Sequence, residues 1–173
     1  MTTQHRVWVY GDHINTDVIF PGKYTYTLKT IDEIASKALE DLDPRFAQEA
    51  QAGDVIVGGR NWGCGSSREQ AVTSLKYKGV VAIITASFNG LYFRNCINQG
   101  IHPIVCPELY TLVQTGDSIE IYHDAGVIRA VGRTFAIPPL SESVQAIIRA
   151  GGLVPMLRAR FGEQISESRV TEK

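Results

Sequence analysis

The sequence has almost no excess of charge of either sign. Seventeen Lys and Arg residues stand against eighteen Asp and Glu residues, which gives a formal net charge of −1. The basic residues are scattered singly, so the chain lacks the cationic face of a nucleic-acid-binding protein. It also lacks an apolar run of the roughly 18 residues that a membrane-spanning helix needs, and its first residues lack the pattern of a signal peptide. We therefore expect a cytoplasmic protein that partners neither nucleic acid nor a membrane.

Cysteine is scarce and widely spaced. Cys64, Cys96 and Cys106 are odd in number, and none of them belongs to a Cys-x-x-Cys pair. This pattern argues against a disulfide framework. A self-contained zinc or iron–sulfur site would need thiolates at closer spacing. We therefore expect that this chain binds no metal by itself.

The rest of the composition is that of an ordinary globular domain. Of the 173 residues, 44% are hydrophobic and 20% are charged, which permits a sizeable core. A chain of this length fits one domain. The segment from Gly162 to Lys173 is too polar to bury much surface. We expect a single α/β domain over residues 1–163 and a polar, frayed tail over residues 164–173.

Apolar periodicity predicts strands that alternate with helices. Short apolar runs bounded by turn residues are typical of buried strands, and apolar residues spaced by three and four are typical of helices. We expect strands at 6–10, 55–57, 80–84 and 104–106, and a hairpin formed by 118–122 and 127–131. We expect helices at 31–51, 71–78, 88–98 and 143–150, with Pro44 either ending the first of them or starting another. The predicted architecture is mixed, with long loops after the first two strands.

The segment from Gly58 to Gln70 holds most of the chemistry. Four glycines precede Ser66, Ser67, Arg68 and a predicted helix. This arrangement would place backbone N–H groups and a helix N-terminus around a bound anion. Ser66 and Glu69 also match a capping box, in which Ser66 caps the helix and no ligand is needed. Both interpretations remain open on the residues alone.

Other motifs do not fit this segment. A P-loop requires lysine after its last glycine, where Ser66 stands here. A nucleophile elbow requires serine at the position that Gly65 occupies. A cysteine nucleophile would need Cys64 paired with one of the four histidines, and no local pattern orients such a pair.

The same residues resemble a known family. Residues 63–71 are similar to the G-x-G-S-S-R-E signature of the aconitase superfamily's swivel domain, in particular the separate small subunits of 3-isopropylmalate dehydratase and homoaconitase. Residues 11–17 resemble the family's opening G-D-x-I-x-T-D, and residues 53–59 resemble its G-D-V-I-V-x-G strand. Residues 88–100 follow its F-x-x-x-[YF]-x-R-N-x-x-N-x-G helix, and residues 139–155 resemble its C-terminal segment. The resemblance spans nearly the whole chain in one order.

This resemblance implies a fold, an activity and a partner. The fold would be a mixed, β-barrel-like sheet flanked by helices, with both long loops at one end. The activity would be that of a hydro-lyase of leucine biosynthesis, which isomerises 2-isopropylmalate and 3-isopropylmalate by dehydration and rehydration. A [4Fe–4S] cluster held by a large subunit would act on the departing hydroxyl, so this chain would be active only with that large subunit.

The resemblance also implies roles for single residues. Ser66 would be the base that removes the carbon-bound proton. Arg68 would bind a substrate carboxylate through its planar guanidinium, and Ser67 would donate a hydrogen bond to the same carboxylate or to the intermediate. Asp17 and Gly65 would support the serine loop, although an aspartate at the position of Asp17 also suits a plain turn.

A serine hydroxyl acts as a base at neutral pH only if its pKa is lowered strongly. A hydroxyl comparable to water has a pKa near 15.7. Lowering that pKa to about neutrality needs roughly 11 kcal/mol. One helix N-terminus supplies only about 0.3 to 2 kcal/mol. Arg68 and the partner must supply much of the rest, so we expect the chain to be catalytically silent alone.

The segment from Pro21 to Ile31 is where relatives in this family choose their substrates. Homoaconitase small subunits carry Y-L-R-T there, and isopropylmalate enzymes carry an apolar residue in place of the arginine. This chain has Leu28, Lys29 and Thr30. In one alignment Lys29 would meet a distal carboxylate, and in another Leu28 would face an apolar tail. The substrate therefore stays open between isopropylmalate, homocitrate or homoaconitate, and a 2,3-dimethylmalate-type acid.

A function of another class is a stand-alone carboxylate- or phosphate-binding module. In that case the loop from Gly63 to Arg68 would bind an anion without catalysis. The monomer would then bind small anions at micromolar concentration without any partner.

Overall fold

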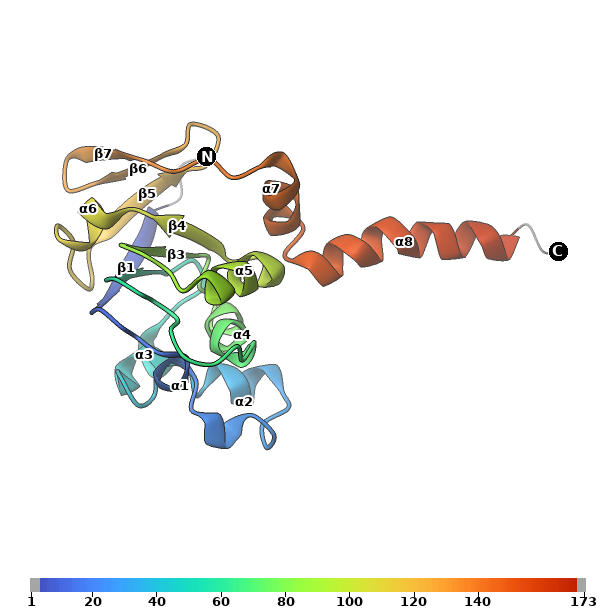
Figure 1. Ribbon diagram of the computed structural model, residues 1–173, viewed down its shortest axis with the longest axis horizontal. Coiled ribbons are helices and arrows are strands. Elements are labelled where there is room, and N and C mark those ends of the chain that lie inside the picture. Colours follow the sequence, from blue (N-terminus) through green and yellow to red (C-terminus); the bar gives the residue numbers. More distant parts are fainter. Residues whose placement is uncertain (1–3, 171–173) are drawn as a thin grey trace.

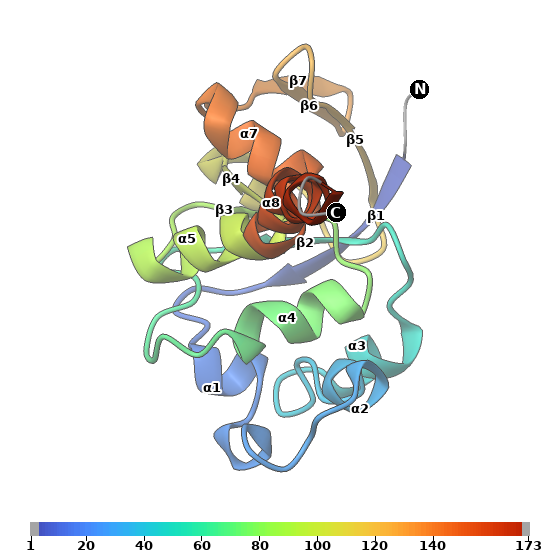
Figure 2. The ribbon, with the colours of Figure 1, turned by 90° about the vertical axis from the view of Figure 1, so that its right-hand side faces the viewer.

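The computed structural model describes residues 4–170, with side chains described through residue 162. The chain forms a seven-stranded mixed sheet in the order β4-β3-β2-β1-β5-β6-β7. The strands are β1 (Gln4–Tyr10), β2 (Val55–Gly58), β3 (Ala82–Thr85), β4 (His102–Val105), β5 (Ser118–Tyr122), β6 (Val127–Ala130) and β7 (Arg133–Ala136). Figures 1 and 2 show that this sheet curls into a half-barrel with helices packed around it. The predicted mixed, barrel-like α/β fold is therefore confirmed.

The helices are α1 (Thr16–Ile19), the 3-10 turn η1 (Gly22–Tyr24), α2 (Ile31–Ala35), α3 (Pro44–Glu49), α4 (Gln70–Tyr77), α5 (Gly90–Gln99), α6 (Pro107–Tyr110), α7 (Glu142–Arg149) and α8 (Leu153–Val170). Those from α1 to α5 lie in the connections between the parallel strands β1 to β4. Parallel strands require crossovers of this kind.

Strand β1 joins a parallel half of the sheet to an antiparallel half. It runs parallel to β2, with Val7 opposite Val55, and antiparallel to β5, with His5 opposite Ile119. Strands β3 and β4 extend the parallel half, whereas β6 and β7 extend the antiparallel half. Because β1 and β2 are parallel neighbours, their carboxyl ends lie at the same edge of the sheet. The two long loops start at that edge.

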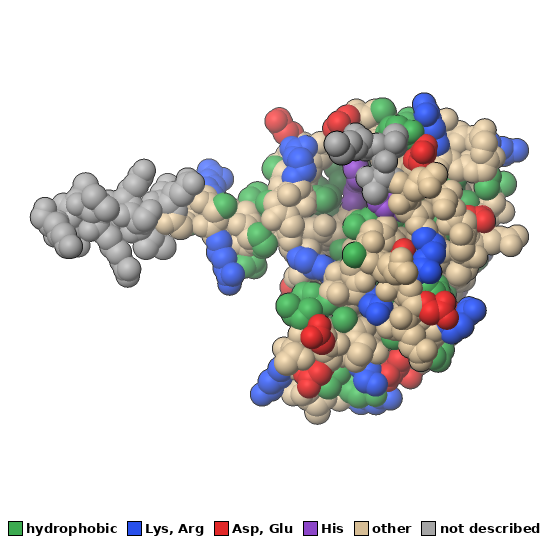
Figure 3. Space-filling view, turned by 180° about the vertical axis from the view of Figure 1, so that it is seen from behind, with side chains coloured by type: hydrophobic (Ala, Val, Ile, Leu, Met, Phe, Trp, Pro, Cys, Tyr) green, Lys and Arg blue, Asp and Glu red, His purple; other side chains and the backbone are tan. Residues whose placement is uncertain are grey.

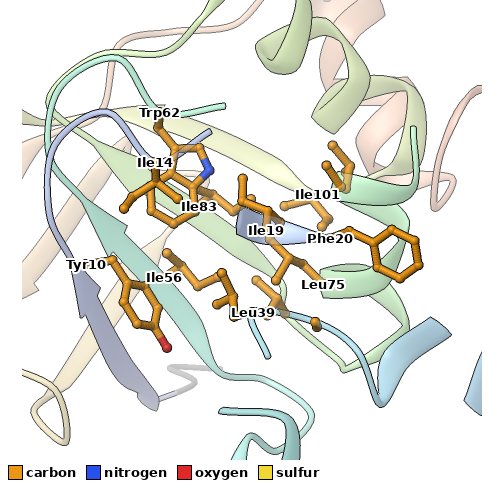
Figure 4. Close-up of a cluster of buried hydrophobic side chains, with 14 of the residues drawn as sticks. Tyr10, Ile14, Ile19, Phe20, Leu39, Ile56, Trp62, Leu75, Ile83 and Ile101 are labelled. Carbon is orange, nitrogen blue, oxygen red and sulfur yellow. The ribbon is translucent and has the colours of Figure 1, made fainter. Parts of the chain in front are cut away.

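Side chains of the parallel strands alternate between two cores. On one face, Ile56 and Ile83 pack with helices α4 and α5 and with Ile14 and Ile19 from the segment after β1 (Figure 4). On the other face, residues such as Val55 pack with α6 and the curled antiparallel strands. Burial on both faces explains why these strands are continuous apolar runs in the sequence. The first core also anchors the segment after β1, which carries half of the candidate site.

The helix expected over residues 31–51 is two short helices. Helix α2 ends at Ala35, and α3 begins at Pro44, so Pro44 starts a helix. Between them, Leu39 has a φ of 57° and is fully buried, and its N–H donates to the carbonyl oxygen of Ile19 at 2.8 Å. Packing of this segment against the loop after β1 overrides the helical periodicity.

Most other predicted elements are present with shifted ends. Strand β3 starts at Ala82, two residues later than expected, and α5 starts at Gly90. Helix α5 ends at Gly100, whose φ of 79° fits the predicted glycine stop. The sequence patterns do not predict α1, α6 or β7, each of which has only four residues.

Helix α8 extends away from the rest of the molecule (Figure 1). It follows the turn at Gly151 and Gly152, where a Cβ on Gly152 would lie 2.6 Å from the carbonyl oxygen of Asn98. The helix continues to Val170, through most of the segment where the sequence predicts a polar tail, and residues 171–173 lie outside the described residues. Within residues 4–170, no helix combines the length and the apolar character that crossing a membrane requires.

Candidate active site

The loops that follow β1 and β2 run side by side beyond the carboxyl ends of these strands. Backbone hydrogen bonds hold the two loops in register. His13 N–H donates to Arg60 O, Gly63 N–H to Ile14 O and Thr16 N–H to Cys64 O, each at 2.8 Å. Since the first loop is anchored in the core of Figure 4, the second loop takes its position from that core.

Two glycines of the second loop lie where a side chain has little space. Gly63 has a φ of 73°, and a Cβ there would collide with the ring of Tyr92. Gly65 has a φ of 100°, and a Cβ there would lie 3.2 Å from Thr16 Oγ1. Both positions combine a backbone conformation that favours glycine with a lack of space. The glycines therefore pack the loop as well as bend it.

Ser66 is exposed where the two loops meet. Its N–H donates to Thr16 Oγ1 at 3.0 Å, and its Oγ accepts a hydrogen bond from Arg68 Nε at 2.9 Å. The two hydroxyl oxygens of Ser66 and Thr16 lie 3.1 Å apart. The sequence analysis missed Thr16, which lies in the G-D-x-I-x-T-D segment, because no spacing rule links residues 50 positions apart.

Ser66 does not cap helix α4. That helix begins at Gln70, and its N-cap residue, Glu69, makes no capping hydrogen bond with its side chain. The Glu69 carboxylate accepts a hydrogen bond from the Gln99 side chain instead. The capping-box interpretation is therefore wrong, because Thr16 and Arg68 already engage the Ser66 side chain and backbone.

Arg68 links three parts of the site. Its guanidinium is half-buried, donates to Ser66, and forms an ion pair with the exposed carboxylate of Asp17. A Cβ on Gly22 would collide with Nη1 of Arg68. The structure thus brings Asp17, Ser66 and Arg68 together. It also places Gly22, which sequence reasoning missed, where the segment from Pro21 to Ile31 passes the guanidinium.

Ser67 is exposed between Ser66 and Arg68, and its carbonyl oxygen accepts a hydrogen bond from Asn95 Nδ2 of helix α5 at 3.3 Å. Within residues 4–170, the backbone N–H groups of Ser67 and Arg68 have no acceptor. The N–H groups of Gly63 and Ser66 are occupied by protein acceptors. Protein acceptors therefore occupy the backbone donors of Gly63 and Ser66, whereas those of Ser67 and Arg68 remain for a ligand.

Lys29 and Leu28 lie further along the same segment. The Lys29 side chain is exposed, and its N–H donates to the Glu33 carboxylate at 3.2 Å next to the cap of α2. Leu28 is half-buried and packs against the core shown in Figure 4. In the described part of the chain, no hydrogen bond or ion pair joins either residue to Ser66 or Arg68.

The cysteines do not converge on the site. Cys96 and Cys106 are buried, and burial raises the pKa of both thiols, so neither is a ready thiolate. Cys64 is half-buried, and its Sγ lies 3.6 Å from the backbone oxygen of His13, not from an imidazole. Among the described residues, no group of three or more His, Cys, Asp or Glu side chains is placed to hold a metal ion. The side chains that the structure describes therefore do not fit an iron–sulfur cluster.

Taken together, the half-barrel sheet and the serine, arginine and aspartate at the paired ends of β1 and β2 define a swivel-type α/β domain with an exposed serine–arginine loop. The chain belongs to the aconitase C-terminal domain family, whose model matches residues 13–109. The resemblance seen in the sequence is thereby confirmed.

Similar proteins carry three different names. A 3-isopropylmalate dehydratase small subunit from Heliobacterium modesticaldum is 41% identical over 91% of this chain and 96% of its own. A 2,3-dimethylmalate dehydratase small subunit from Eubacterium barkeri is 40% identical over 92% of this chain and 98% of its own. A methanogen homoaconitase small subunit from Methanothermobacter thermautotrophicus is 43% identical over 86% of each chain.

A solved structure agrees with the whole fold. The crystal structure of 3-isopropylmalate dehydratase from Methanocaldococcus jannaschii matches with a TM-score of 0.87 and 37% identity, and covers 96% of this chain and 99% of its own. The similarity extends well beyond residues 13–109, so it includes the antiparallel half of the sheet.

Proposed function

We propose that this chain is the small subunit of a heteromeric hydro-lyase that isomerises 2-isopropylmalate and 3-isopropylmalate in leucine biosynthesis. The observation that carries the proposal is the Ser66 hydroxyl, which lies exposed 2.9 Å from the Arg68 guanidinium on the loop that matches the family signature. The chain's relatives are small subunits by name, which supports a larger partner subunit. Its three free cysteines suit the reducing cytoplasm, where we place the enzyme.

Ser66 acts as the base in this proposal. Its oxygen takes a proton from one carbon of the hydroxy acid while the C–O bond at the neighbouring carbon breaks. The hydroxyl group leaves as hydroxide, and transfer of the proton gained by Ser66 to this hydroxide gives water and restores the deprotonated serine. The products are an alkene and water, and the reverse addition with the two carbons exchanged completes the isomerisation. The Arg68 Nε–H favours the deprotonated serine because a hydrogen bond to an ionised acceptor is about twice as strong as a neutral one.

Arg68 and Ser67 hold the substrate carboxylate. Arg68 donates a hydrogen bond from Nε to Ser66 and another from one Nη to Asp17. Its guanidinium has further N–H groups, which can donate hydrogen bonds to a substrate carboxylate. The free backbone N–H groups of Ser67 and Arg68 lie beside them. Asp17 holds the guanidinium in place, and since its carboxylate is exposed, the ion pair itself contributes little stability.

The partner supplies what this chain lacks. In the family, a [4Fe–4S] cluster provides Lewis-acid assistance to the departing hydroxyl, and we propose that the large subunit holds it. Ser66 and Ser67 are exposed in the single chain, so water surrounds the base. A partner that covers this face excludes water and strengthens each hydrogen bond to the deprotonated oxygen. The single chain is therefore inactive.

The substrate choice rests on the segment from Pro21 to Ile31. Identity to the three named kinds of relative is nearly equal, between 40% and 43%, so it does not separate their substrates. Lys29 is exposed and suits a distal carboxylate, as in homoaconitate, whereas Leu28 is half-buried and suits an apolar tail. We favour isopropylmalate, with homoaconitase and dimethylmalate dehydratase as the alternatives.

The test is turnover by the reconstituted pair. The purified chain is mixed with its large subunit, the cluster is restored under anaerobic conditions, and alkene formation is followed by ultraviolet absorbance with each of the three acids. We expect isopropylmalate to give the highest kcat/KM. A higher value with homocitrate or dimethylmalate would select that alternative, and no turnover of any of them would contradict a dehydratase.

The same preparation separates catalysis from plain anion binding. The stand-alone binding module requires free backbone donors, yet two of the loop's N–H groups are already bonded to the first loop. We expect calorimetry on the chain alone to show no micromolar binding of malate or phosphate. Tight binding of either anion without the large subunit would favour the binding module.

A further inference from the structure

Thr16 makes contacts that the reaction described above does not assign. It begins helix α1 and is only 1% exposed, although its side chain is polar. Its backbone is held at both ends, because its N–H donates to Cys64 O at 2.8 Å and its carbonyl accepts from Phe20 N–H at 3.0 Å. Gly65 leaves the space directly beside its hydroxyl. Thr16 Oγ1 is therefore a fixed point in the site, while Ser66 is exposed.

The hydrogen bonds of Thr16 can be counted. A threonine hydroxyl has one hydrogen and two lone pairs. One lone pair accepts the Ser66 N–H at 3.0 Å, and the other neighbour of Oγ1 is Ser66 Oγ at 3.1 Å. Within the described residues, Thr16 Oγ1 makes hydrogen bonds to no other group. Its hydroxyl hydrogen thus has one protein acceptor, which is the oxygen of Ser66.

The direction of this bond depends on the state of Ser66. While Ser66 keeps its proton, either hydroxyl is able to donate to the other. Once Ser66 has lost its proton, its oxygen can only accept, and the Thr16 hydroxyl becomes a donor to an ionised oxygen. Hydrogen bonds of that kind favour the charged form of the acceptor. Arg68 Nε–H already supplies one such donor at 2.9 Å.

We propose that Thr16 is a positioning residue for Ser66, which holds the Ser66 backbone N–H and donates the second hydrogen bond to the Ser66 oxygen when that oxygen is deprotonated. This inference rests on the proposed function of Ser66 as the base. It gives Gly65 a defined role as well, since a side chain at Gly65 would displace Thr16 Oγ1 from the pair.

The test compares Thr16→Val with Thr16→Ser in the reconstituted pair. Valine keeps the shape of threonine without the hydroxyl, whereas serine keeps the hydroxyl and loses the methyl group. We expect Thr16→Val to lower kcat about 100-fold, because removal of one hydrogen-bond donor to a developing oxyanion lowers kcat by about that factor. KM should change little, because Thr16 is only 1% exposed and is assigned no hydrogen bond to the substrate. The rise of kcat with pH should shift to higher pH in Thr16→Val, and Thr16→Ser should restore both kcat and the pH profile.

A purely structural Thr16 would behave differently. In that case Thr16→Val would retain kcat and the pH profile, or Thr16→Ser would be as impaired as Thr16→Val, and either result would overturn the inference. Thermal unfolding of each variant shows whether it is folded.

Amide hydrogen exchange keeps the inference testable if Thr16→Val does not fold or the wild-type pair has no activity. In the full wild-type chain, followed by NMR, the Ser66 N–H should exchange at least about 10-fold more slowly than the Ser67 N–H, which has no acceptor in the described structure. Equal exchange of the two would overturn the role of Thr16. Inactivity of the wild-type pair with a protected Ser66 N–H would instead count against the proposed function alone.

Discussion

At the scale of single residues, two glycines of the site leave no room for a Cβ atom, for different reasons. The neighbour of Gly22 is the end of the flexible Arg68 side chain, which can move away. The neighbour of Gly63 is the ring of Tyr92, which is 2% exposed and held in the core. The same substitution by alanine should therefore impair activity at one position and stability at the other.

Gly22→Ala should displace the Arg68 guanidinium while leaving the fold intact. We expect kcat/KM of the reconstituted pair to fall by about 10-fold to 1,000-fold, the range for one misplaced catalytic group, with the melting temperature unchanged. Gly90→Ala is a matched control, because a Cβ at Gly90 meets nothing within 4 Å. Wild-type kcat/KM in Gly22→Ala would contradict the role given to Arg68.

Gly63→Ala should destabilise the chain. The substitution combines a φ of 73° with a collision against Tyr92, so we expect the free energy of unfolding to fall by about 2 to 5 kcal/mol. Urea unfolding followed by circular dichroism measures this. A loss of less than about 0.5 kcal/mol would show that the loop tolerates a side chain at this position.

A residue's place in the site can be predicted from the sequence only when its contacts lie close to it along the chain. The segment containing Ser66, Ser67 and Arg68 is readable as a signature, and the structure places Asp17 against Arg68. The supporting roles of Asp17 and Gly65 stay predictions. Thr16 and Gly22 touch that segment across about 50 residues of chain, and nothing in local spacing records such contacts. The assigned roles of Ser66, Ser67, Arg68, Lys29 and Leu28 stay predictions until activity is measured.

At the scale of elements, two histidines join opposite parts of the curled sheet. His102 begins the edge strand β4, and His123 lies in the turn between β5 and β6. Their Nδ1 atoms are 3.1 Å apart, and their rings are stacked with centroids 5.0 Å apart. They line a surface hollow together with residues of α7, and Figure 3 shows histidine side chains beside a hollow on that face.

This pair makes stability sensitive to mild acid. Burial, followed by the charge of His123, lowers the pKa of His102 to about 4, and burial also lowers the pKa of His123. Both imidazoles are therefore neutral in the folded chain and bind protons more readily when it unfolds, where the pKa of histidine is about 6.5. The stabilisation is complete above pH 6.5 and is lost as the pH falls toward 4.

Urea unfolding at pH 7.5 and pH 5 tests this. We expect the free energy of unfolding to fall by about 2 kcal/mol between these pH values, since His102 carries most of the shift. Buried carboxylates such as Asp54, whose pKa is lowered, lose their contribution only at lower pH. His102→Gln should flatten the dependence, and an unchanged dependence in His102→Gln would contradict this account.

Elements with a clear apolar pattern follow from the sequence, whereas elements that form through packing between loops do not. Strands β2 and β3 are short, but each is a continuous apolar run that is buried on both faces, and helix α5 carries an apolar stripe. Helix α1 has only four residues, yet its buried Ile19 anchors the first loop and Thr16 begins it. Its existence depends on packing between loops, to which no periodicity applies.

At the scale of the whole molecule, the pairing of β1 with both β2 and β5 decides the shape. β1 contacts residues more than 100 positions away in β5, such as Gln4 with Glu120. Composition and periodicity identify the strands but not this pairing. The half-barrel was predictable only through resemblance to the family, and the matching crystal structure confirms it.

The whole molecule also presents an incomplete site. Ser66 and Ser67 lie exposed on one edge of the half-barrel. Of the three cysteines, only Cys64 lies on the same loop, and Cys96 and Cys106 are buried elsewhere. We therefore infer that Ser66 becomes a base only when a cluster-bearing large subunit covers it.

The most direct measurement is kcat of the reconstituted pair with Ser66→Ala in the small subunit. General-base catalysis contributes a factor of about 100 to 10,000 to the rate, so we expect kcat to fall at least about 100-fold. Assembly with the large subunit, measured by gel filtration, and the melting temperature should be unchanged, and Ser143→Ala on α7 should be fully active. A Ser66→Ala pair that turns over at the wild-type rate would contradict the account.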